Sequence, residues 1–169
     1  ENLVYVNGIE IYRPLLIRSG QQEGLSFVNP QMTSSVEFSA GGFGAEYGDK
    51  MSSVLDIEYK QPEDFEASFH ASLLGANAFV GNASKDGRFT QIHGIRYKTN
   101  NYLLGSLQTK GEYQSDYFDY QTYLTYRLHE KWEVSFLGNL SQNTYAFRPE
   151  SRETEMGSFQ TKYSFKVYF

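Results

Sequence analysis

Several residue types and patterns are missing from this sequence, and each absence narrows its function. It contains no cysteine, which excludes disulfide bonds, thiolate chemistry and cysteine-based zinc sites. Its 15 basic residues are outnumbered by 20 acidic ones, which argues against a nucleic-acid partner because phosphate binding requires a basic surface. The longest apolar run, Leu3 to Val6, is far shorter than the ~20 residues of a membrane-spanning helix. No signal peptide is recognisable, so we expect the N-terminus of an exported precursor to lie upstream of Glu1.

Aromatic residues, by contrast, are abundant. They make up 17% of the chain, with 14 Tyr, 13 Phe and one Trp. Tyr and Phe have favourable strand propensity, so this composition favours β-structure. The mean hydropathy of −0.53 is polar, but a transmembrane barrel alternates lipid-facing and lumen-facing residues and therefore keeps a polar average. The composition is compatible with both a soluble β-protein and a membrane barrel.

The sequence pattern changes near Gln61-Pro62, from short strand-like segments broken by Gly, Pro and Ser to longer strand-like runs. We therefore place a domain boundary there, between residues 1–61 and 62–169. In the first part, Asn7-Gly8 between two apolar segments predicts a β-hairpin, because a type I′ turn needs positive φ at both central residues. Asn29-Pro30 predicts the start of a short helix. The remaining expectations for this part are a loop at residues 13–24 and strands at residues 36–38 and 53–59.

The second part alternates apolar and polar residues with a period of two, as half-buried strands do. In four segments every second residue falls on one uncharged, largely apolar face, while the interleaved positions carry charged residues such as Glu66, Asp119 and Arg127. These segments are residues 65–73, 118–128, 132–140 and 159–169, and two less regular strands are expected at residues 77–84 and 88–98.

The connections between these strands alternate in length. Residues 85–87 and 129–131 are tight turns and the link near Gly75 is short, whereas residues 99–116 and 145–158 form long connections. Outer-membrane barrels have short periplasmic turns and longer outer loops, so both tight turns fit the periplasmic side. A soluble antiparallel sandwich, with the apolar face as its core, explains the alternation equally well. Strand length favours the barrel, because a spanning strand needs about 9–11 residues and a typical globular strand about 5–6.

One stretch carries a resemblance to a known family. Val36-Glu37-Phe38 and the Gly-rich run that follows it, up to Tyr47-Gly48, resemble the plug signature of TonB-dependent outer-membrane receptors. Residues 4–9 are similar to the Val-x-Val-Asp-Gly-Val hairpin of that family, and residues 54–60 to the last plug strand. The sequence departs from the family pattern at residues 40–41 and 52–53, where the family has Gly-Pro and a Gly-rich step.

We interpret the motif residues as structural. Glycines suit tight turns against a barrel wall, and Tyr47 is expected to pack between the plug sheet and that wall, with ligand contact as the alternative. The motif residues are Asn7, Gly8, Pro30, Gly41, Gly42, Gly44, Tyr47 and Gly48.

The resemblance implies a mainly β fold, in which the C-terminal portion of a small mixed plug domain is followed by about six antiparallel strands of a transmembrane β-barrel. It implies a bacterial outer-membrane location and energised uptake of a scarce nutrient, whether siderophore, cobalamin, glycan or peptide. The implied partners are the remainder of the same plug and barrel, outer-membrane lipid, a surface lipoprotein, and TonB through a segment outside this chain. No cofactor is implied.

Substrate in this family binds between the outer loops and the apices of the plug. Transferred to this sequence, that expectation falls on polar and aromatic residues of one plug loop and two long barrel loops. The candidate ligand-binding residues are Arg13, Arg18, Gln21, Asn100, Asn101, Tyr113, Arg148 and Arg152.

Other motifs favour no enzyme activity. Gly42, Gly44 and Gly48 give G-x-G-x-x-x-G, one residue too long for the dinucleotide fingerprint, and the sequence has no G-x-S-x-G elbow. His70, His93 and His129 stand apart, which predicts solvated or lumen-facing histidines rather than a metal site. The carboxylates between residues 150 and 155 are expected in a surface loop, with calcium or ligand contact as a lesser alternative.

Two other functions remain open at this stage. The chain could be part of a receptor-like barrel that acts as a structural or docking subunit of an outer-membrane complex, or a soluble β-domain that binds a ligand. A TonB-contact segment upstream would favour transport over a docking role. Insolubility without detergent would exclude the soluble domain.

Overall fold

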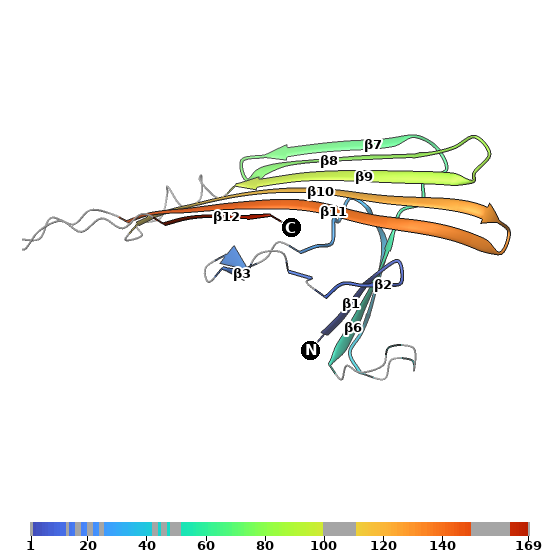
Figure 1. Cartoon of the computed structure of the whole chain (residues 1–169), viewed down its shortest axis with the longest axis horizontal. Coiled ribbons are helices and arrows are strands. Elements are labelled where there is room, and N and C mark those ends of the chain that lie inside the picture. The colour runs from blue at the N-terminus through green and yellow to red at the C-terminus, as the bar shows by residue number, and fades with distance from the viewer. Residues whose placement is uncertain are drawn as a thin grey trace, which may run out of the picture.

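A computed structural model describes residues 2–12, 14–15, 18–19, 22–23, 26–41, 44, 47, 52–99, 111–149 and 163–168 of the chain. The fold is mainly β, as expected, with antiparallel sheets. In the described ranges the strands form a four-stranded sheet, a six-stranded sheet and a two-stranded pair, and no helix is present (Figure 1).

The four-stranded sheet has the order β2-β1-β6-β5. Its strands are β1 (Asn2–Val6), β2 (Ile9–Glu10), β5 (Thr33–Ser39) and β6 (Ser53–Tyr59). Strands β1 and β6 are parallel, and the other pairs are antiparallel. The expected hairpin is confirmed: β1 and β2 pair across Asn7 and Gly8, whose φ angles of 50° and 75° are the positive values that a type I′ turn requires.

Two expectations for the first part are wrong. Asn29-Pro30 begins a single turn, closed by a 3.0 Å hydrogen bond from the Met32 amide to the Asn29 carbonyl, and not a helix. The chain enters β5 at Thr33 directly afterwards, and its Thr-Ser-Ser-Val start has weak helix propensity. The stretch expected as a loop contains a short antiparallel pair, β3 (Arg18–Ser19) and β4 (Gln22–Glu23).

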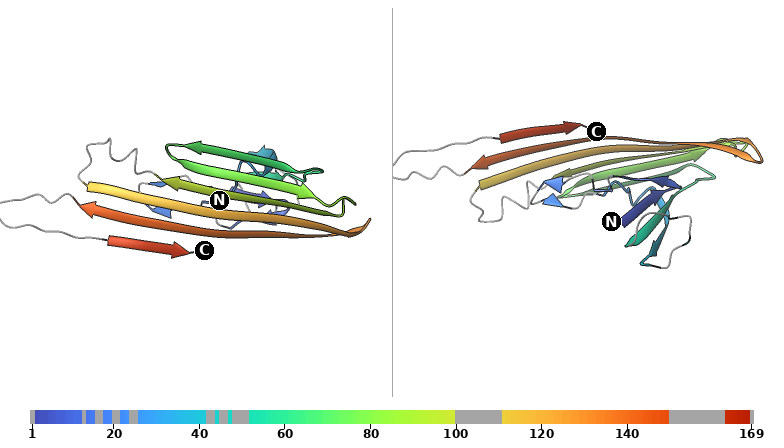
Figure 2. Two further views of the ribbon diagram at one scale, coloured as in Figure 1. Left: turned by 90° about the horizontal axis from the view of Figure 1, so that it is seen from above. Right: turned by 60° about the horizontal axis from the view of Figure 1, so that its bottom comes forward.

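The six-stranded sheet is antiparallel throughout and follows sequence order from β7 to β12. Figure 2 shows the strands side by side, with the N-terminal part of the chain on one face. All six expected strands are confirmed, and so are the tight turns at residues 85–87 and 129–131. The strands are β7 (Glu66–Ser72), β8 (Gly75–Ala83), β9 (Phe89–Thr99), β10 (Gly111–His129), β11 (Trp132–Pro149) and β12 (Tyr163–Tyr168).

Strands β10 and β11 extend further than expected. Their ladder runs from the turn at residues 130–131 to the pair Gly111↔Pro149, with one register shift between Arg127 and His129. Residues 111–116 and 145–149, expected in long loops, are therefore strand. The sequence suggested loops there because polar residues interrupt the alternation, but each strand supplies the other with backbone partners, and Tyr and Phe in these segments favour extended structure.

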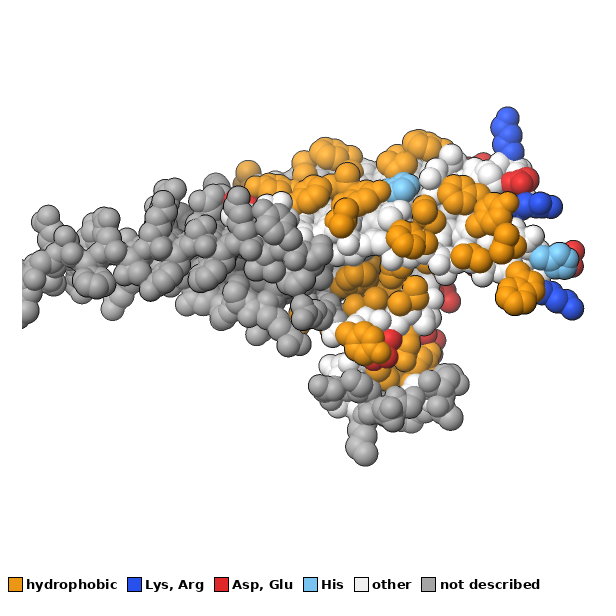
Figure 3. All heavy atoms as spheres, in the orientation of Figure 1, with side chains coloured by type: hydrophobic (Ala, Val, Ile, Leu, Met, Phe, Trp, Pro, Cys, Tyr) orange, Lys and Arg blue, Asp and Glu red, His pale blue; other side chains and the backbone are white. Residues whose placement is uncertain are grey.

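The two faces of the six-stranded sheet differ in chemistry and in exposure. The face predicted to be apolar is confirmed as apolar in β7, β10 and β11 and is uncovered in this chain, with Phe69 71%, Trp132 70% and Leu140 65% exposed. The expectation is wrong for β12, because its register with β11 pairs Phe165 and Val167 with Tyr145 and Asn143, which are positions of the polar face. Figure 3 shows hydrophobic side chains over the visible part of this sheet and charged ones gathered at the end with the tight turns. The interleaved polar face is covered instead: Asp119 and Gln121 have 0% exposure. The polar face, and not the apolar one, packs on the four-stranded sheet.

A small apolar core joins the two sheets. Met32, Ile57 and Tyr59 from the N-terminal part pack with Phe79, Ile92 and Tyr123 of the six-stranded sheet. The four-stranded sheet ends at Tyr59 and the six-stranded sheet begins at Glu66. In the part of the chain that the structure describes, no helix has the length and apolar character to cross a membrane.

Candidate functional site

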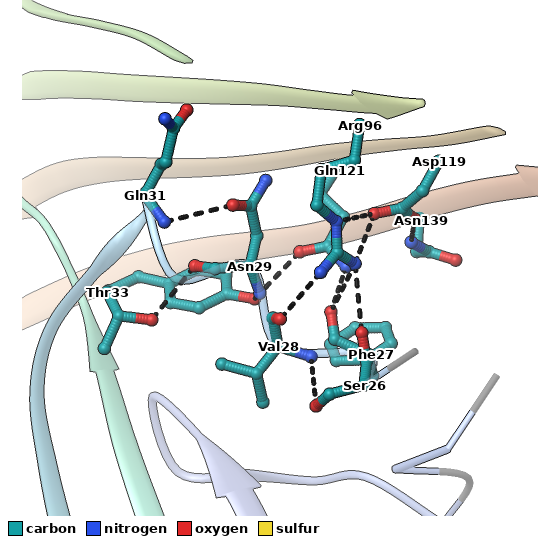
Figure 4. A network of polar contacts seen from close by, with 11 residues as sticks. Ser26, Phe27, Val28, Asn29, Gln31, Thr33, Arg96, Asp119, Gln121 and Asn139 are labelled. Atoms are coloured by element: carbon teal, nitrogen blue, oxygen red, sulfur yellow. Dashed lines mark hydrogen bonds and ion pairs between the residues drawn. The ribbon is translucent and has the colours of Figure 1, made fainter. Parts of the chain in front are cut away.

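A buried cluster of polar side chains lies between the two sheets. A short segment, Ser26–Asn29, which we call the strap, crosses the polar face of β9, β10 and β11 just before the turn into β5 (Figure 4). Its backbone has no strand partner beyond the bridge between Leu15 and Ser26 among the described residues. Side chains from the six-stranded sheet hydrogen-bond its carbonyl groups, so the strap is held by side chains.

Arg96 of β9 is the main holder of the strap. Its guanidinium donates to three successive carbonyls, at 3.1 Å to Ser26, 3.2 Å to Phe27 and 2.8 Å to Val28. The same group forms a bidentate contact with one oxygen of Asp119, through Nε at 2.8 Å and Nη2 at 2.5 Å. The planar fork of arginine is suited to this task because its five N–H groups can serve a carboxylate and several carbonyls at once.

Asp119 of β10 compensates the buried positive charge of Arg96. Arg96 and Asp119 are directly opposite each other in the β9–β10 ladder, with 6% and 0% exposure. The second oxygen of Asp119 accepts a 2.6 Å hydrogen bond from the Asn139 side-chain amide of β11. Both carboxylate oxygens are thus satisfied, which a buried charge requires.

Gln121 and Tyr59 extend the network toward the core. The Gln121 amide donates to the Phe27 carbonyl and accepts a 2.8 Å hydrogen bond from the Tyr59 hydroxyl. The backbone N–H of Asn29 donates a hydrogen bond to the Tyr59 hydroxyl oxygen at 3.4 Å. Tyr59 is 2% exposed, and burial raises its pKa to about 12 because the phenolate would lose its hydration. The phenol therefore stays protonated and donates to Gln121 at neutral pH.

Gly94 allows the close approach of the N-terminal part to β9. A Cβ atom at this position would lie 2.4 Å from Nδ2 of Asn29 and 2.7 Å from Sδ of Met32. Gly94 faces Gln121 across the ladder, so the strap and the following turn sit against a bare stretch of backbone. Beside this contact the Lys60 ammonium lies 4.8 Å from the centre of the Phe79 ring, a cation–π contact between the two parts.

Two cavities whose charged lining residues are of opposite sign flank the network. One, of about 650 Å³, lies between the four-stranded sheet and β10–β11, and its charged lining residues are Asp56, Glu58 and Glu133. The other, of about 370 Å³, lies at the β7–β9 side of the sheet near the link at Gly75. Its lining includes His70, Arg96 and Lys98, with no carboxylate among the residues that form it.

Three of the eight expected ligand-binding residues lie in the described part of the chain. Arg18 lies in β3, whereas Tyr113 and Arg148, expected in outer loops, lie in β10 and β11 and pair with Phe147 and Glu112. The remaining candidates, Arg13, Gln21, Asn100, Asn101 and Arg152, are outside the described residues, as are the carboxylates between 150 and 155.

The expected motif residues have clearer structural roles. The Asn7 side chain accepts a 2.8 Å hydrogen bond from the Tyr59 amide and so ties the β1–β2 turn to the end of β6. Tyr47 donates to Asp56 at 2.7 Å and packs on Tyr5 at 5.5 Å. Gly41 has a φ of 81°. Pro30 and Gly44 are exposed, and Gly42 and Gly48 are outside the described residues.

The three histidines lie apart, on different strands. His70 is exposed on the polar face of β7, and His129 is exposed beside a tight turn. His93 lies on the apolar face, where its Nδ1 is 2.9 Å from the Tyr120 hydroxyl and the two rings stack at 6.1 Å. His93 is half-buried there. Within the described ranges, no three His, Asp or Glu side chains are grouped to hold a metal ion.

The residues that form the network were not among the sequence candidates. Arg96 and Asp119 could have been noticed as opposite charges on the polar faces of two expected strands. Their pairing depends on the β9–β10 register, which a long connection does not fix. Comparison with known proteins adds no assignment, since no family model, curated protein or solved structure matches this chain.

Proposed function

We propose that this chain is part of a TonB-dependent transporter of the bacterial outer membrane. In this proposal the four-stranded sheet and the strap belong to the plug, and β7–β12 are strands of the surrounding barrel. The whole protein would take up a scarce nutrient, with energy supplied through TonB contact at a segment outside this chain. The remainder of the plug and barrel, and the outer-membrane lipid, would be its immediate partners.

One observation carries the proposal, namely the inverted sidedness of the six-stranded sheet. The apolar face of β7, β10 and β11 is uncovered, whereas Arg96, Asp119 and Gln121 on the opposite face are buried beneath the N-terminal part of the same chain. Water-soluble sheets arrange the two faces the other way round. Barrel strands in lipid need this inverted arrangement, because the apolar residues face the acyl chains and the polar residues face the lumen.

The extent of the apolar face also agrees with a membrane span. In β10 it runs from Phe118, which is 44% exposed, to Leu128, which is 59% exposed. This stretch is close to the 9–11 residues that a tilted strand needs to cross the hydrocarbon core. Beyond Leu128 the charged residues of the tight turn begin, as expected at the membrane–water boundary on the periplasmic side.

The sidedness can be measured with a pair of neighbouring residues of β11. Leu140 lies on the apolar face, and Asn139 on the polar face. We expect a nitroxide spin label at Leu140→Cys, in the complete protein in bilayers, to collide with oxygen and to be shielded from a water-soluble nickel complex. A label at Asn139→Cys, which lies on the covered polar face, should collide with oxygen much less often. Oxygen collision at Leu140→Cys no more frequent than at Asn139→Cys, or ready access of the nickel complex to Leu140→Cys, would refute the membrane placement.

A docking subunit of an outer-membrane complex is the second candidate, because the same sidedness fits it. A measurement of solute uptake distinguishes the transporter from the docking subunit. Cells with the intact gene should deplete at least one solute from the medium that cells without it leave, and an uncoupler of the proton gradient should abolish the difference. If no solute behaves in this way while the spin labels report lipid, the chain belongs to a docking barrel.

A further inference from the structure

The smaller cavity, near the link at Gly75, has a basic lining that the plug–barrel contact does not explain. His70, Asn77 and Arg96 are direct neighbours in one row across β7, β8 and β9. Lys98 is two residues beyond Arg96 on β9 and therefore on the same polar face. All four line a cavity of about 370 Å³ with no carboxylate in its lining.

The charges of this cavity are unequally compensated. Arg96 is paired with Asp119 at 2.5 Å. Lys98 is exposed and forms no ion pair with any carboxylate in the part of the chain that the structure describes. The cavity therefore carries excess positive charge at Lys98, with the His70 ring available as a further hydrogen-bonding group.

Asn77 adds a polar group that lacks a partner. Its Oδ1 atom is buried and accepts no hydrogen bond among the described residues, although the side chain lies in the same row as His70 and Arg96. Buried polar atoms are almost always satisfied, by protein, water or ligand. The side-chain amide can present either its oxygen or its NH₂ group, according to which way it is turned.

We propose that this cavity binds the oxyanion of a water-soluble solute, with Lys98 as the main charged contact and His70 and Asn77 as hydrogen-bonding groups. A lipid head group does not fit, because these side chains lie on the face opposite the exposed apolar one. The identification of this anion with the transported nutrient rests on the proposed function and gives that nutrient a class, an anionic solute. The binding site itself needs only the sheet.

Binding can be measured on the complete purified protein in detergent, with succinate and inorganic phosphate as separate probes for a carboxylate and a phosphate. We expect at least one of them to bind, and Lys98→Glu to weaken that binding at least about tenfold, because a cation is replaced by an anion. Lys85→Glu makes the same charge change in the tight turn at the other end of the sheet and should leave binding unchanged.

Two results would overturn the site. One is the absence of binding of either probe up to about 10 mM, far weaker than a useful substrate contact. The other is an equal loss of affinity in Lys98→Glu and Lys85→Glu, which would reflect net charge and no local site. This assay requires no transport, so an anion bound by a protein that transports nothing would refute the proposed function and leave the site intact.

Discussion

Replacement of Arg96 by methionine tests how the strap is held. Methionine keeps most of the length of the side chain and removes its charge and all its donors. Three strap carbonyls then lose their Arg96 partner, although that of Phe27 keeps the Gln121 amide. Asp119, with 0% exposure, keeps only the hydrogen bond from Asn139. The variant therefore leaves a buried carboxylate without a counter-charge unless the strap lifts and admits water.

The expected magnitude follows from that buried charge. Removal of one partner of a buried ion pair costs about 3–5 kcal/mol. Lifting the strap relieves most of this cost, so the equilibrium between the closed and the lifted strap should shift by about the same amount. At 1.4 kcal/mol per factor of ten, the population with a lifted strap should rise roughly 100- to 4,000-fold. Arg127→Met is the matched control, because Arg127 and Glu133 are 3.9 Å apart and more than 40% exposed. The control should change the equilibrium by less than about 1 kcal/mol.

The assay uses the absence of cysteine from this chain. A single Val28→Cys substitution places a thiol in the strap, where the side chain is half-buried, and its rate of maleimide labelling reports how often the strap lifts. We expect Arg96→Met to raise this rate by at least two orders of magnitude, and Asp119→Asn added to it to reverse part of the increase. A rate within threefold of that of the Val28→Cys parent would refute the assignment of Arg96 as the holder of the strap.

Two further predictions concern the same interface. Gly94→Ala should shift the strap equilibrium toward the lifted state by about 1–3 kcal/mol, the usual cost of overpacking, and so increase the labelling rate at Val28→Cys. Gly138→Ala should not change this rate, because its Cβ would meet mainly the movable ring of Phe136. Because burial raises the pKa of Tyr59 to about 12, its contribution, about 3 kcal/mol, should be full below pH 10 and lost as pH rises from 10 to 12. Urea unfolding of Tyr59→Phe should lack this fall in stability, and an unchanged pH profile in that variant would contradict the assignment.

Local patterns predicted the strands well. The Asn7-Gly8 turn and the tight turns at residues 85–87 and 129–131 are set by residues adjacent in sequence, and period-two alternation located the strands between them. Strand ends were harder, because a partner strand decides them. Tyr113 is in β10 because β11 continues opposite it. The turn after Asn29 fails to become a helix because β5 begins at once beside β6.

The strap network was beyond the reach of local patterns. Its central pair, Arg96 and Asp119, is separated by a long connection, and only the β9–β10 register brings the two together. The strap itself has no alternation or motif that marks it as a binding partner of this pair. The sequence identified which face was polar in β7, β10 and β11, but not in β12, whose register with β11 it could not fix. It could not show that the polar face would be the covered one, because alternation is the same for a soluble sandwich and for a barrel.

Sidedness is the property that separates these two architectures. A sandwich would require a second sheet over Phe69, Phe136 and Leu140, which are 57–71% exposed in this chain. The opposite face of the same sheet, which carries Arg96 and Asp119, is already buried. A sandwich would therefore bury both faces of this sheet, one apolar and one charged. A buried ion pair is at best equal to apolar packing in stability, so a soluble fold gains nothing from placing charges there. In a barrel that spans a lipid bilayer the outer face must be apolar. Charged residues of its strands therefore face the lumen or a plug domain inside it. The position of Arg96 under the strap is the consequence expected of that constraint, and it is the reason why the proposal assigns the uncovered face to lipid.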